Sequence, residues 1–462
     1  MSSNKKTETK SQCISQRSSF SGKIGFVLAA AGSAVGLGNI WRFPYLAAQH
    51  GGGIFLLVYI LLSLTFGFTL MVAEIAIGRK TRLSPIEAFK KLDKRFGFIG
   101  ILAAIVPMLI LPYYSVIGGW VTKYAVGFVT GEMTNMADSA YFGNYISQTW
   151  EPIIWFFVFI GLTALIVLFG VQKGIEKVSK VMMPVLIALM IFIITYTFIT
   201  TDNIWSGVGY YLRPDFSKFT YMTVVAAMGQ LFYSMSLAMG IMITFGSYMK
   251  KDISIEKSAH QIEIFDTGIA FLAGLMIVPA CIAFDPAQLK KGPGLMFGVL
   301  PKIFDNMPGG AFIGATFFIM VLLAALTSSI SLMETVVSTI QDKWKLDRKF
   351  SCLITLGISI LLGLLSCLGY SNFSGFAFFG KFQMLDFFDF ITNSVMMPII
   401  ALLTCVFISY FLKPKTVIDE ISLSGSFKLK NMFSVMIKYV APVCLVIILV
   451  FAILEGVGVI TV

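Results

Sequence analysis

Eleven long apolar stretches run through almost the whole chain, and they constrain its fold more than any other feature. A helix needs roughly 20 apolar residues to cross the hydrocarbon core of a bilayer. Within that core every backbone polar group must be bonded inside the protein, which favours helices. The sequence therefore predicts an all-α polytopic membrane protein. We expect its eleven transmembrane helices at 24–47, 53–78, 98–129, 151–171, 178–200, 220–249, 262–284, 309–340, 350–370, 385–412 and 433–458.

The composition excludes most other classes of protein. The chain is 57% hydrophobic and only 13% charged, so a soluble domain of this length would lack polar surface. Its six cysteines are scattered without a CxxC pair, which argues against a metal site or a disulfide framework. The chain has only two histidines, His50 and His260, which argues against a catalytic centre built from histidine.

Lysine and arginine residues indicate the orientation in the membrane. If the N-terminus lies inside, most of the 35 basic residues fall in the tail 1–23 and in inner loops, as the positive-inside rule expects. The net charge of +11 then faces the anionic inner leaflet. An odd number of spans places the C-terminus outside. The basic segments lie before Ile24 and at 79–95, 173–180, 250–257, 343–349 and 413–438.

Two spans carry small and polar residues at mid-depth. Gly32–Asn39 in span one holds three glycines, and Ser234–Gly240 in span six is similarly small and polar. These spans begin two five-helix halves, 24–200 and 220–412, followed by an extra helix, 433–458. Broken helices at matching places in an inverted repeat mark a binding site, because their free N–H groups suit a carboxylate and their carbonyls suit a cation. For glycines alone, close packing of helices is the better explanation.

The residues from Gly32 to Pro44, GSAVGLGNIWRFP, resemble the first-helix signature of neurotransmitter:sodium symporters. The chain is most similar to the eleven-helix bacterial subgroup, which includes a tyrosine transporter. The resemblance implies a sodium-coupled amino-acid symporter in the bacterial inner membrane, not an enzyme, with one transporter domain at 24–458. The match continues through Gly51–Gly53, Glu74–Arg79, Tyr113-Tyr114, Gln230–Tyr248, Leu326–Ser329 and Leu385–Asp389.

The resemblance implies two sodium sites built from oxygen atoms, which hard cations prefer. The first combines main-chain and side-chain oxygens of Ala34, Asn39, Ser234 and Asp266 with the substrate carboxylate. The second uses Gly32, Val35, Ala324, Thr327 and Ser328. Many animal relatives have Asn where this chain has Asp266 and require chloride beside it, so we expect independence from chloride. The alternative for the hydroxyls of Thr327 and Ser328 is bonding to their own helix.

The resemblance also implies a pocket for a zwitterion. No charged side chain lines it, and Met239, a deformable residue, stands where some relatives have Phe. This favours a hydrophobic or aromatic amino acid, with tyrosine the first candidate. The substrate-binding residues are predicted to be Ser33, Ala34, Leu37, Gly38, Ile110, Tyr114, Tyr233, Ser234, Ser236, Met239, Ser331 and Leu332.

Alternating access requires a closure on each side of the pocket. By the same resemblance, Arg42 and Asp389 pair on the outside, and Arg17 and Asp342 pair on the inside near Tyr248. Glu74 is expected to cap free N–H groups of span six. Glu334, within span eight, has no assigned role, and a link to protons is open.

Two alternative functions share these features. One is a proton-coupled amino-acid transporter of the same fold, against which the paired hydroxyls and the Asn39–Asp266 set argue. The other is an amino-acid sensor that does not transport, for which a fused signalling domain would be expected. The sequence leaves the sodium stoichiometry and the oligomeric state open.

Overall fold

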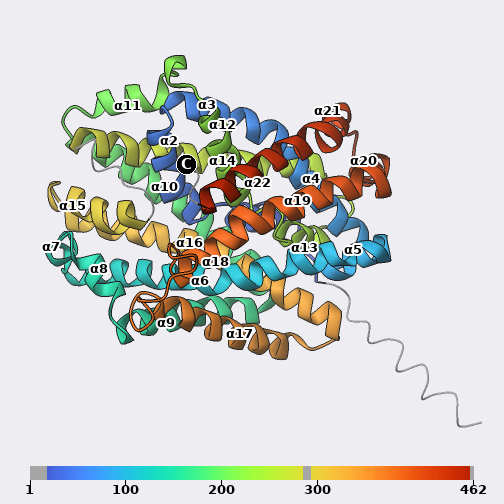
Figure 1. Ribbon diagram of the computed structural model, residues 1–462, viewed down its shortest axis with the longest axis horizontal. Helices are drawn as coiled ribbons and strands as arrows, with labels where there is room; N and C mark the ends of the chain where they lie inside the picture. Colours follow the sequence, from blue (N-terminus) through green and yellow to red (C-terminus); the bar gives the residue numbers. More distant parts are fainter. Residues whose placement is uncertain (1–17, 285–292, 458–462) are drawn as a thin grey trace, which may run out of the picture.

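Long helices that run side by side make up the protein (Figure 1). The computed structural model describes residues 18–284 and 293–457, and these ranges contain no β-strand. Nine of their helices are long and apolar enough to cross a membrane, which confirms the all-α polytopic class. These helices cover Gly53–Thr81, Lys94–Thr130, Trp150–Leu168, Val171–Thr200, Ile255–Phe284, Gly310–Trp344, Arg348–Leu368, Met384–Leu412 and Lys430–Gly456.

The remaining two predicted spans are broken. In span one, α1 (Lys23–Ala34) is followed by the helical segment Gly38–Gln49, which includes α2 (Phe43–Gln49), at an angle of 54°. In span six, α12 (Tyr221–Ser234) and α13 (Ile241–Tyr248) are separated by six non-helical residues, 235–240. Both breaks fall where the small and polar residues predicted them. The division into two inverted repeats stays a prediction.

The helix boundaries follow the sequence closely, with four larger differences. Helix α14 begins at Ile255, α16 continues to Trp344, span five begins at Val171 and span three begins at Lys94. Each extension adds polar or charged residues that a hydropathy argument leaves out, because a helix can continue beyond the bilayer into water. Other labelled segments of the spans are α3 (Gly53–Leu62), α4 (Phe68–Thr81), α6 (Gly97–Thr130), α9 (Trp150–Leu168), α10 (Lys177–Thr200), α17 (Arg348–Leu368), α18 (Met384–Asp389), α19 (Met397–Val406), α21 (Lys430–Val435) and α22 (Ala441–Val457).

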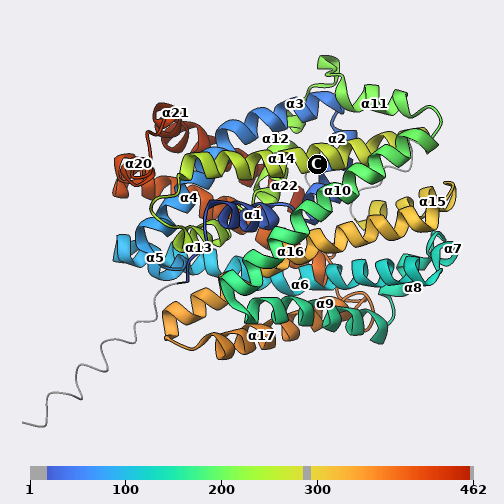
Figure 2. The ribbon, with the colours of Figure 1, turned by 180° about the vertical axis from the view of Figure 1, so that it is seen from behind.

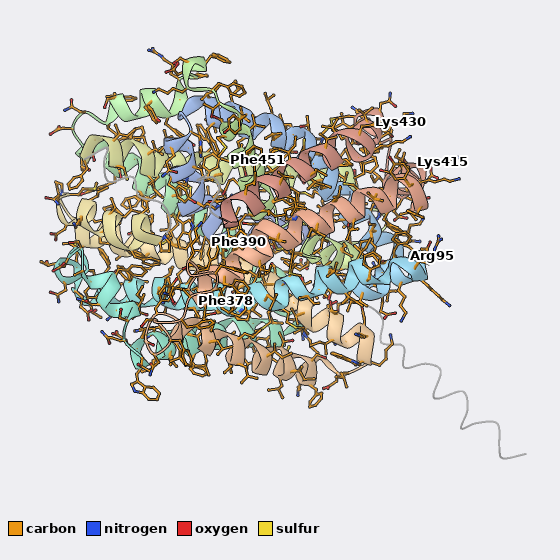
Figure 3. All side chains as sticks on the ribbon, viewed as in Figure 1. Arg95, Phe378, Phe390, Lys415, Lys430 and Phe451 are labelled. Carbon is orange, nitrogen blue, oxygen red and sulfur yellow. The ribbon has the colours of Figure 1, made fainter. Side chains whose placement is uncertain are left out.

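Short helices lie at the two ends of the bundle. At one end are α5 (Pro85–Leu92), the predicted amphipathic segment, and α20 (Pro414–Ser422). Arg95, Lys415 and Lys430 gather at this same end (Figure 3), which the positive-inside rule predicts to be cytoplasmic. At the other end are α7 (Met133–Met136), α8 (Tyr141–Ile146), α11 (Ile204–Leu212) and α15 (Leu300–Asp305).

Helix α1 runs through the interior of the bundle. It packs against α10, α14 and α16, and Figure 2 shows it between α14 and α16. A methyl group on Gly32 would lie 3.3 Å from Cβ of Thr327, which explains a glycine at this crossing. The first break is thereby held between helices and away from lipid.

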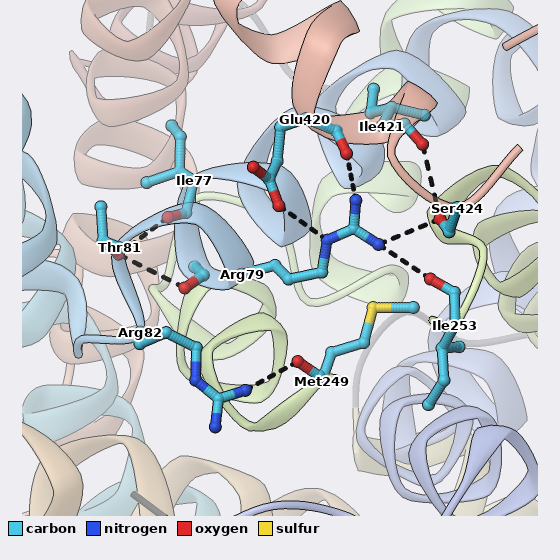
Figure 4. A network of polar contacts seen from close by, with 10 residues as sticks. Ile77, Arg79, Thr81, Arg82, Met249, Ile253, Glu420, Ile421 and Ser424 are labelled. Carbon is cyan, nitrogen blue, oxygen red and sulfur yellow. Dashed lines mark hydrogen bonds and ion pairs between the residues drawn. The ribbon is translucent and has the colours of Figure 1, made fainter. Parts of the chain in front are cut away.

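A buried arginine joins three segments at the α5 end of the bundle (Figure 4). The Arg79 side chain is fully buried, and its Nε lies 2.9 Å from Oε1 of Glu420 on α20. The same guanidinium donates to the carbonyl of Ile253, to Oγ of Ser424 and to the carbonyl of Glu420. Because a buried charge needs such partners, this one residue fixes α4, α20 and the segment after α13 together.

We expect Arg79→Met to lower the free energy of unfolding by about 3–5 kcal/mol, because it leaves the buried Glu420 carboxylate unpaired. Thermal denaturation of the purified protein measures the change. Arg95→Met is the matched control, since Arg95 pairs with Asp93 at the surface and should change stability little. Adding Glu420→Gln to Arg79→Met should restore part of the lost stability. If Arg79→Met and Arg95→Met lost the same stability, the structural role of the Arg79–Glu420 pair would be contradicted.

Candidate sodium and substrate sites

The two breaks face each other across the centre of the bundle. The Ser236 hydroxyl donates to the carbonyl of Ser33 at 3.0 Å, and the Oγ atoms of these two serines lie 3.2 Å apart. Ser236 and Ala238 both adopt left-handed backbone conformations, with φ of 53° and 60°. Such strain in residues other than glycine is typical of functional segments.

Asp266 on α14 lies at the centre of the first predicted sodium site. Its Oδ1 accepts hydrogen bonds from Oγ of Ser234 at 2.6 Å and from Nδ2 of Asn39 at 2.8 Å. Asn39 comes from the first break and Ser234 ends α12, so three separate helices meet at one carboxylate. All three side chains are buried. The structure therefore brings together the side chains that the resemblance implied.

Tyr59 on α3 is a fourth member of this group that the sequence did not reveal. Its hydroxyl donates to Oδ2 of Asp266 at 3.2 Å. Gln230 on α12 supports the same region from the other side, because its Nε2 donates to the carbonyl of Gly38 at 2.9 Å. A polar side chain within an apolar span was the available signal for Tyr59, but a tyrosine in a membrane helix is common.

Ser328 on α16 reaches the first break at a second place. Its hydroxyl lies 3.1 Å from the carbonyl oxygen of Val35 and 3.5 Å from that of Gly32. Thr327 donates to the carbonyl of Ala324 at 3.0 Å within its own helix. The five residues of the second predicted sodium site thus lie together. The Thr327 hydroxyl also bonds a carbonyl of its own helix, as the alternative explanation for this residue expected.

The donor atoms of both groups suit sodium by their chemistry. They are carboxylate, amide, hydroxyl and carbonyl oxygens, which a small hard cation prefers. Across residues 18–284 and 293–457, no three His, Cys, Asp or Glu side chains are grouped as a transition-metal site would need. Sodium, as the transported ion, would bind to these oxygens. It would compete there with the protein donors that hydrogen-bond to the same oxygens in this structure.

A small cavity separates the two breaks. Its volume is about 30 Å³, which is room for only a few water molecules. An amino acid can bind only if the lining side chains move apart, so the described conformation is closed around its site. The lining residues are Ser33, Ala34, Gly36, Leu37, Gly38, Asn39, Ile110, Tyr114, Tyr233, Ser236, Met239, Ile241, Ser328 and Leu332.

Most predicted substrate residues line this cavity, and two do not. The Ser331 hydroxyl donates to the carbonyl of Thr327 in its own helix, and the Ser234 hydroxyl is bonded to Asp266. Gly36 and Ile241 line the cavity but were not predicted. Ile241 begins α13 directly after the second break, and only the path of the backbone through that break decides where its side chain points.

Glycines bring the first break close to aromatic rings. A methyl group on Gly38 would lie 2.3 Å from the Tyr233 ring, and one on Gly36 would lie 2.6 Å from Oγ of Ser328. The amide of Leu37 donates to the Tyr114 hydroxyl at 3.3 Å. Tyr114 and Tyr233 thus lie directly against the N–H groups that were predicted to bind the substrate carboxylate.

Glu74 on α4 meets the backbone of the second break, as the sequence predicted. Its Oε1 accepts from the amide of Ala238 at 2.7 Å, and its side chain is buried. Lipid could not satisfy this amide, because no water or other acceptor is present in the hydrocarbon core. Glu74 therefore stabilises the non-helical conformation of residues 235–240.

The predicted outer pair, Arg42 and Asp389, is not in direct contact. The Arg42 guanidinium lies over the Tyr233 ring, 5.4 Å from its centroid. Oδ1 of Asp389 accepts from Nδ2 of Asn393 at 2.6 Å. The two charged groups therefore lie beside the tyrosine rings without an ion pair between them. Each has its own stabilising contact, the Tyr233 ring for the guanidinium and the Asn393 amide for the carboxylate.

Charged and polar side chains also lie on the side of the cavity opposite Arg42 and Asp389. Arg17 lies outside the described residues, and Oδ2 of Asp342 accepts from the amide of Ser84 at 2.7 Å. The Tyr248 hydroxyl donates to Oε1 of Glu334 at 2.7 Å, and Arg348 lies 2.5 Å from Oε2 of the same carboxylate. Glu334 thus links α13 to α17, a role that the sequence left unassigned.

Two broken helices that share buried oxygen groups and a closed cavity define a membrane transporter for a small solute and a cation. Comparison with known proteins specifies the class. The model of the sodium:neurotransmitter symporter family matches residues 17–144 and 143–458. The chain belongs to this family, and it is a sodium-dependent transporter rather than an enzyme.

Individual relatives extend over most of the chain. The sodium-dependent transporter YhdH of Bacillus subtilis is 37% identical over 439 residues, which are 92% of this chain and 95% of YhdH. The sodium- and chloride-dependent taurine transporter of Homo sapiens is 28% identical over 76% of this chain and 65% of its own. The crystal structure of MhsT in complex with L-phenylalanine has a TM-score of 0.85 and 34% identity, covering 94% of this chain and all of MhsT.

We expect Asp266→Ala and Ser328→Ala each to raise the sodium concentration for half-maximal uptake by about tenfold or more. A lost bond to a charged group costs about 1.5–3 kcal/mol, and 1.4 kcal/mol corresponds to a factor of ten. Uptake into proteoliposomes at varied sodium measures the effect. Ser331→Ala, on the same helix as Ser328, is the control and should respond to sodium normally. A normal response in all three variants would refute both sodium sites.

Proposed function

We propose that this protein imports a hydrophobic or aromatic amino acid, with tyrosine the first candidate, together with sodium by alternating access and without chloride. The observation that carries the proposal is the arrangement at the first break. There Leu37, whose amide donates to the Tyr114 hydroxyl, and Gly38 line the same cavity as Asn39, whose side chain bonds Asp266. A carboxylate and a cation can bind there side by side.

The chemistry of the cavity lining supports an apolar substrate side chain. Ile110, Met239, Ile241 and Leu332 form its apolar part, and no lining residue is charged. Unpaired acidic or basic side chains would lose their hydration in such a lining without gaining a partner. The L-phenylalanine bound in MhsT is in accord with this class of substrate. An apolar lining discriminates weakly between similar side chains, so tyrosine remains a first candidate.

Independence from chloride is proposed from the charge of Asp266. A carboxylate at this position supplies a fixed negative charge where the first sodium ion would bind. The taurine transporter is named for both sodium and chloride, so the requirement varies among relatives of this chain. The carboxylate already accepts bonds from Ser234, Asn39 and Tyr59, which hold it in place for a cation.

The direction of transport follows from the orientation that the basic residues indicate. An inward sodium gradient would load the sites from the α11 end and release at the α5 end. Tyr114 and Tyr233 on one side of the cavity, and the Tyr248–Glu334–Arg348 contact on the other, would act as the two closures that alternating access needs.

Uptake of labelled tyrosine into proteoliposomes tests the proposal. Accumulation is expected only with an inward sodium gradient, and competition by unlabelled amino acids ranks the substrates. Sodium-dependent uptake of leucine or tryptophan without tyrosine uptake would correct the substrate alone. Binding without accumulation would favour a sensor, and accumulation driven by a proton gradient without sodium would contradict the coupling.

We expect Met239→Phe to shift the preference towards smaller amino acids. The larger, stiffer ring reduces the space for the substrate, and a difference of one methylene group is worth roughly 10–200-fold in selectivity. The ratio of tyrosine to alanine uptake under a sodium gradient measures the shift. Met228→Phe is the control, because Met228 is buried on α12 but does not line the cavity. An unchanged ratio in Met239→Phe would exclude this residue from the substrate pocket.

Replacing chloride by gluconate on both sides of the membrane should leave sodium-driven uptake within about twofold of its value in chloride, because a fixed carboxylate needs no added anion. The taurine transporter, assayed in the same way, provides the chloride-requiring comparison. Loss of uptake by this protein in gluconate would refute the proposed role of Asp266 as a fixed charge.

A further inference from the structure

A second cavity lies at the α11 end of the bundle, away from the substrate site. Its volume is about 630 Å³, and it opens to the surface between α11 and the segment 213–218 that follows it. Helix α11 packs against α14 and α3 (Figure 1). None of the predicted sodium, substrate or gate residues lines this cavity. It is large enough for a molecule of several polar and apolar groups.

Three consecutive glycines shape the wall of this cavity. A methyl group on Gly52 would lie 2.2 Å from the carbonyl oxygen of Tyr210, and one on Gly53 would lie 2.6 Å from the backbone of Arg213. Gly52 also forms a β-bridge with Pro214, and its φ is 61°. The glycines therefore let the 213–218 segment close onto the chain just after α2, which fixes the cavity as part of the fold.

Two basic side chains line the cavity and leave it with a net positive charge. Arg213 is exposed and forms no ion pair within the described parts of the chain. Nζ of Lys218 lies 4.7 Å from the centroid of the Tyr210 ring and 3.7 Å from Asp215. The Ser217 hydroxyl lowers the pKa of Asp215 by hydrogen bonding, so this carboxylate stays charged and balances one of the two cations. The Arg213 guanidinium remains for an external anion.

Exposed aromatic rings surround the two basic groups. Trp205 and Phe216 line the cavity and are 72% and 71% exposed, and Tyr221 at the start of α12 is 66% exposed. Leu212, between the cavity residues, is 41% exposed. Exposed aromatic and apolar side chains next to Arg and Lys are typical of the interface between lipid and water, where rings sit at the level of the headgroups.

We propose that this cavity binds the headgroup of an anionic phospholipid from the leaflet at the α11 end. The phosphate would bind to Arg213 and Lys218, and the acyl chains would lie along Trp205, Phe216 and Leu212. Arginine suits this role because its planar guanidinium binds phosphate oxygens in pairs. A free phosphate ester has the same anionic chemistry but gains nothing from the apolar rim, which is the reason to assign the site to lipid.

The bound lipid would act on the transporter through the outer half of span one. The cavity segment is bridged to Gly52, and the Tyr210 hydroxyl donates to the carbonyl of Ala48 at 2.6 Å, at the end of α2. Helix α2 directly follows Arg42 of the predicted outer closure. A headgroup on Arg213 and Lys218 is therefore expected to hold α2 and α11 together and to raise the thermal stability of the protein.

The test uses the full-length protein, purified and stripped of lipid in detergent. Phosphatidylglycerol and phosphatidylcholine with identical acyl chains are added, and binding is measured by native mass spectrometry and by thermal stability. We expect phosphatidylglycerol to bind more tightly to the wild type. Each of Arg213→Gln and Lys218→Gln should weaken its binding roughly fivefold, the effect of one basic residue near a membrane surface.

Two sets of control variants separate this site from general effects. Lys302→Gln and Lys381→Gln, each made singly, remove the same charge from the same end of the bundle outside the cavity and should leave binding unchanged. Gly209→Phe fills the cavity, because a side chain there meets nothing within 4 Å, and should abolish selective binding. Gly161→Phe is its match, since Gly161 is also an exposed helical glycine with open space around it.

Each outcome decides the proposal. Selective binding that is lost in Gly209→Phe and weakened in the Arg213 and Lys218 variants supports it, even if one of the charge variants folds poorly. Equal binding of the two lipids to the wild type, or unchanged selectivity in Gly209→Phe, overturns it. Equal protection by glycerol 3-phosphate or inorganic phosphate would also overturn the assignment to lipid, because the acyl chains would then contribute nothing.

Discussion

Backbone groups freed at the two helix breaks must find partners inside the protein, since the bilayer core offers none. The rest of the structure follows from this requirement. Glu74 accepts the amide of Ala238, Gln230 donates to the carbonyl of Gly38, and Ser328 donates to carbonyls of the first break. Each partner comes from a different helix. The breaks therefore persist only because the surrounding bundle places these side chains, and the substrate and sodium would use the same groups.

The cost of a buried carboxylate explains the group around Asp266. An aspartate at the centre of a membrane helix is unfavourable by about 2.5–3.5 kcal/mol on insertion scales. A hydrogen bond to a charged group contributes about 1.5–3 kcal/mol, and Ser234, Asn39 and Tyr59 supply three of them. These donors are sufficient to keep the carboxylate in place without a cation. Sodium must therefore displace or share them, which makes its binding depend on the positions of three helices.

The two closures differ in their physical character. On the side of Arg42 and Asp389, a cation lies over the Tyr233 ring and a carboxylate accepts a hydrogen bond from an amide, and the two charges attract each other without forming an ion pair. On the side of Tyr248, a buried carboxylate pairs directly with Arg348 and joins α13 to the scaffold of α16 and α17. Separating a buried ion pair costs more than moving a cation off a ring. The first closure is therefore the easier one to open from the described conformation.

The sequence by itself determined the all-α membrane class, the spans to within about seven residues at their ends, both breaks and most residues around them. It could do so because hydropathy and small polar residues act locally, and because the Gly32–Pro44 signature is long and specific. Tyr59 on Asp266, Ile241 in the cavity, Ser331 outside it and Arg348 on Glu334 were decided only by the tertiary structure. So were the separation of Arg42 from Asp389 and the cavity beneath α11. These contacts join residues far apart in the chain, and their geometry depends on how non-helical backbone turns at each break, which no local pattern encodes.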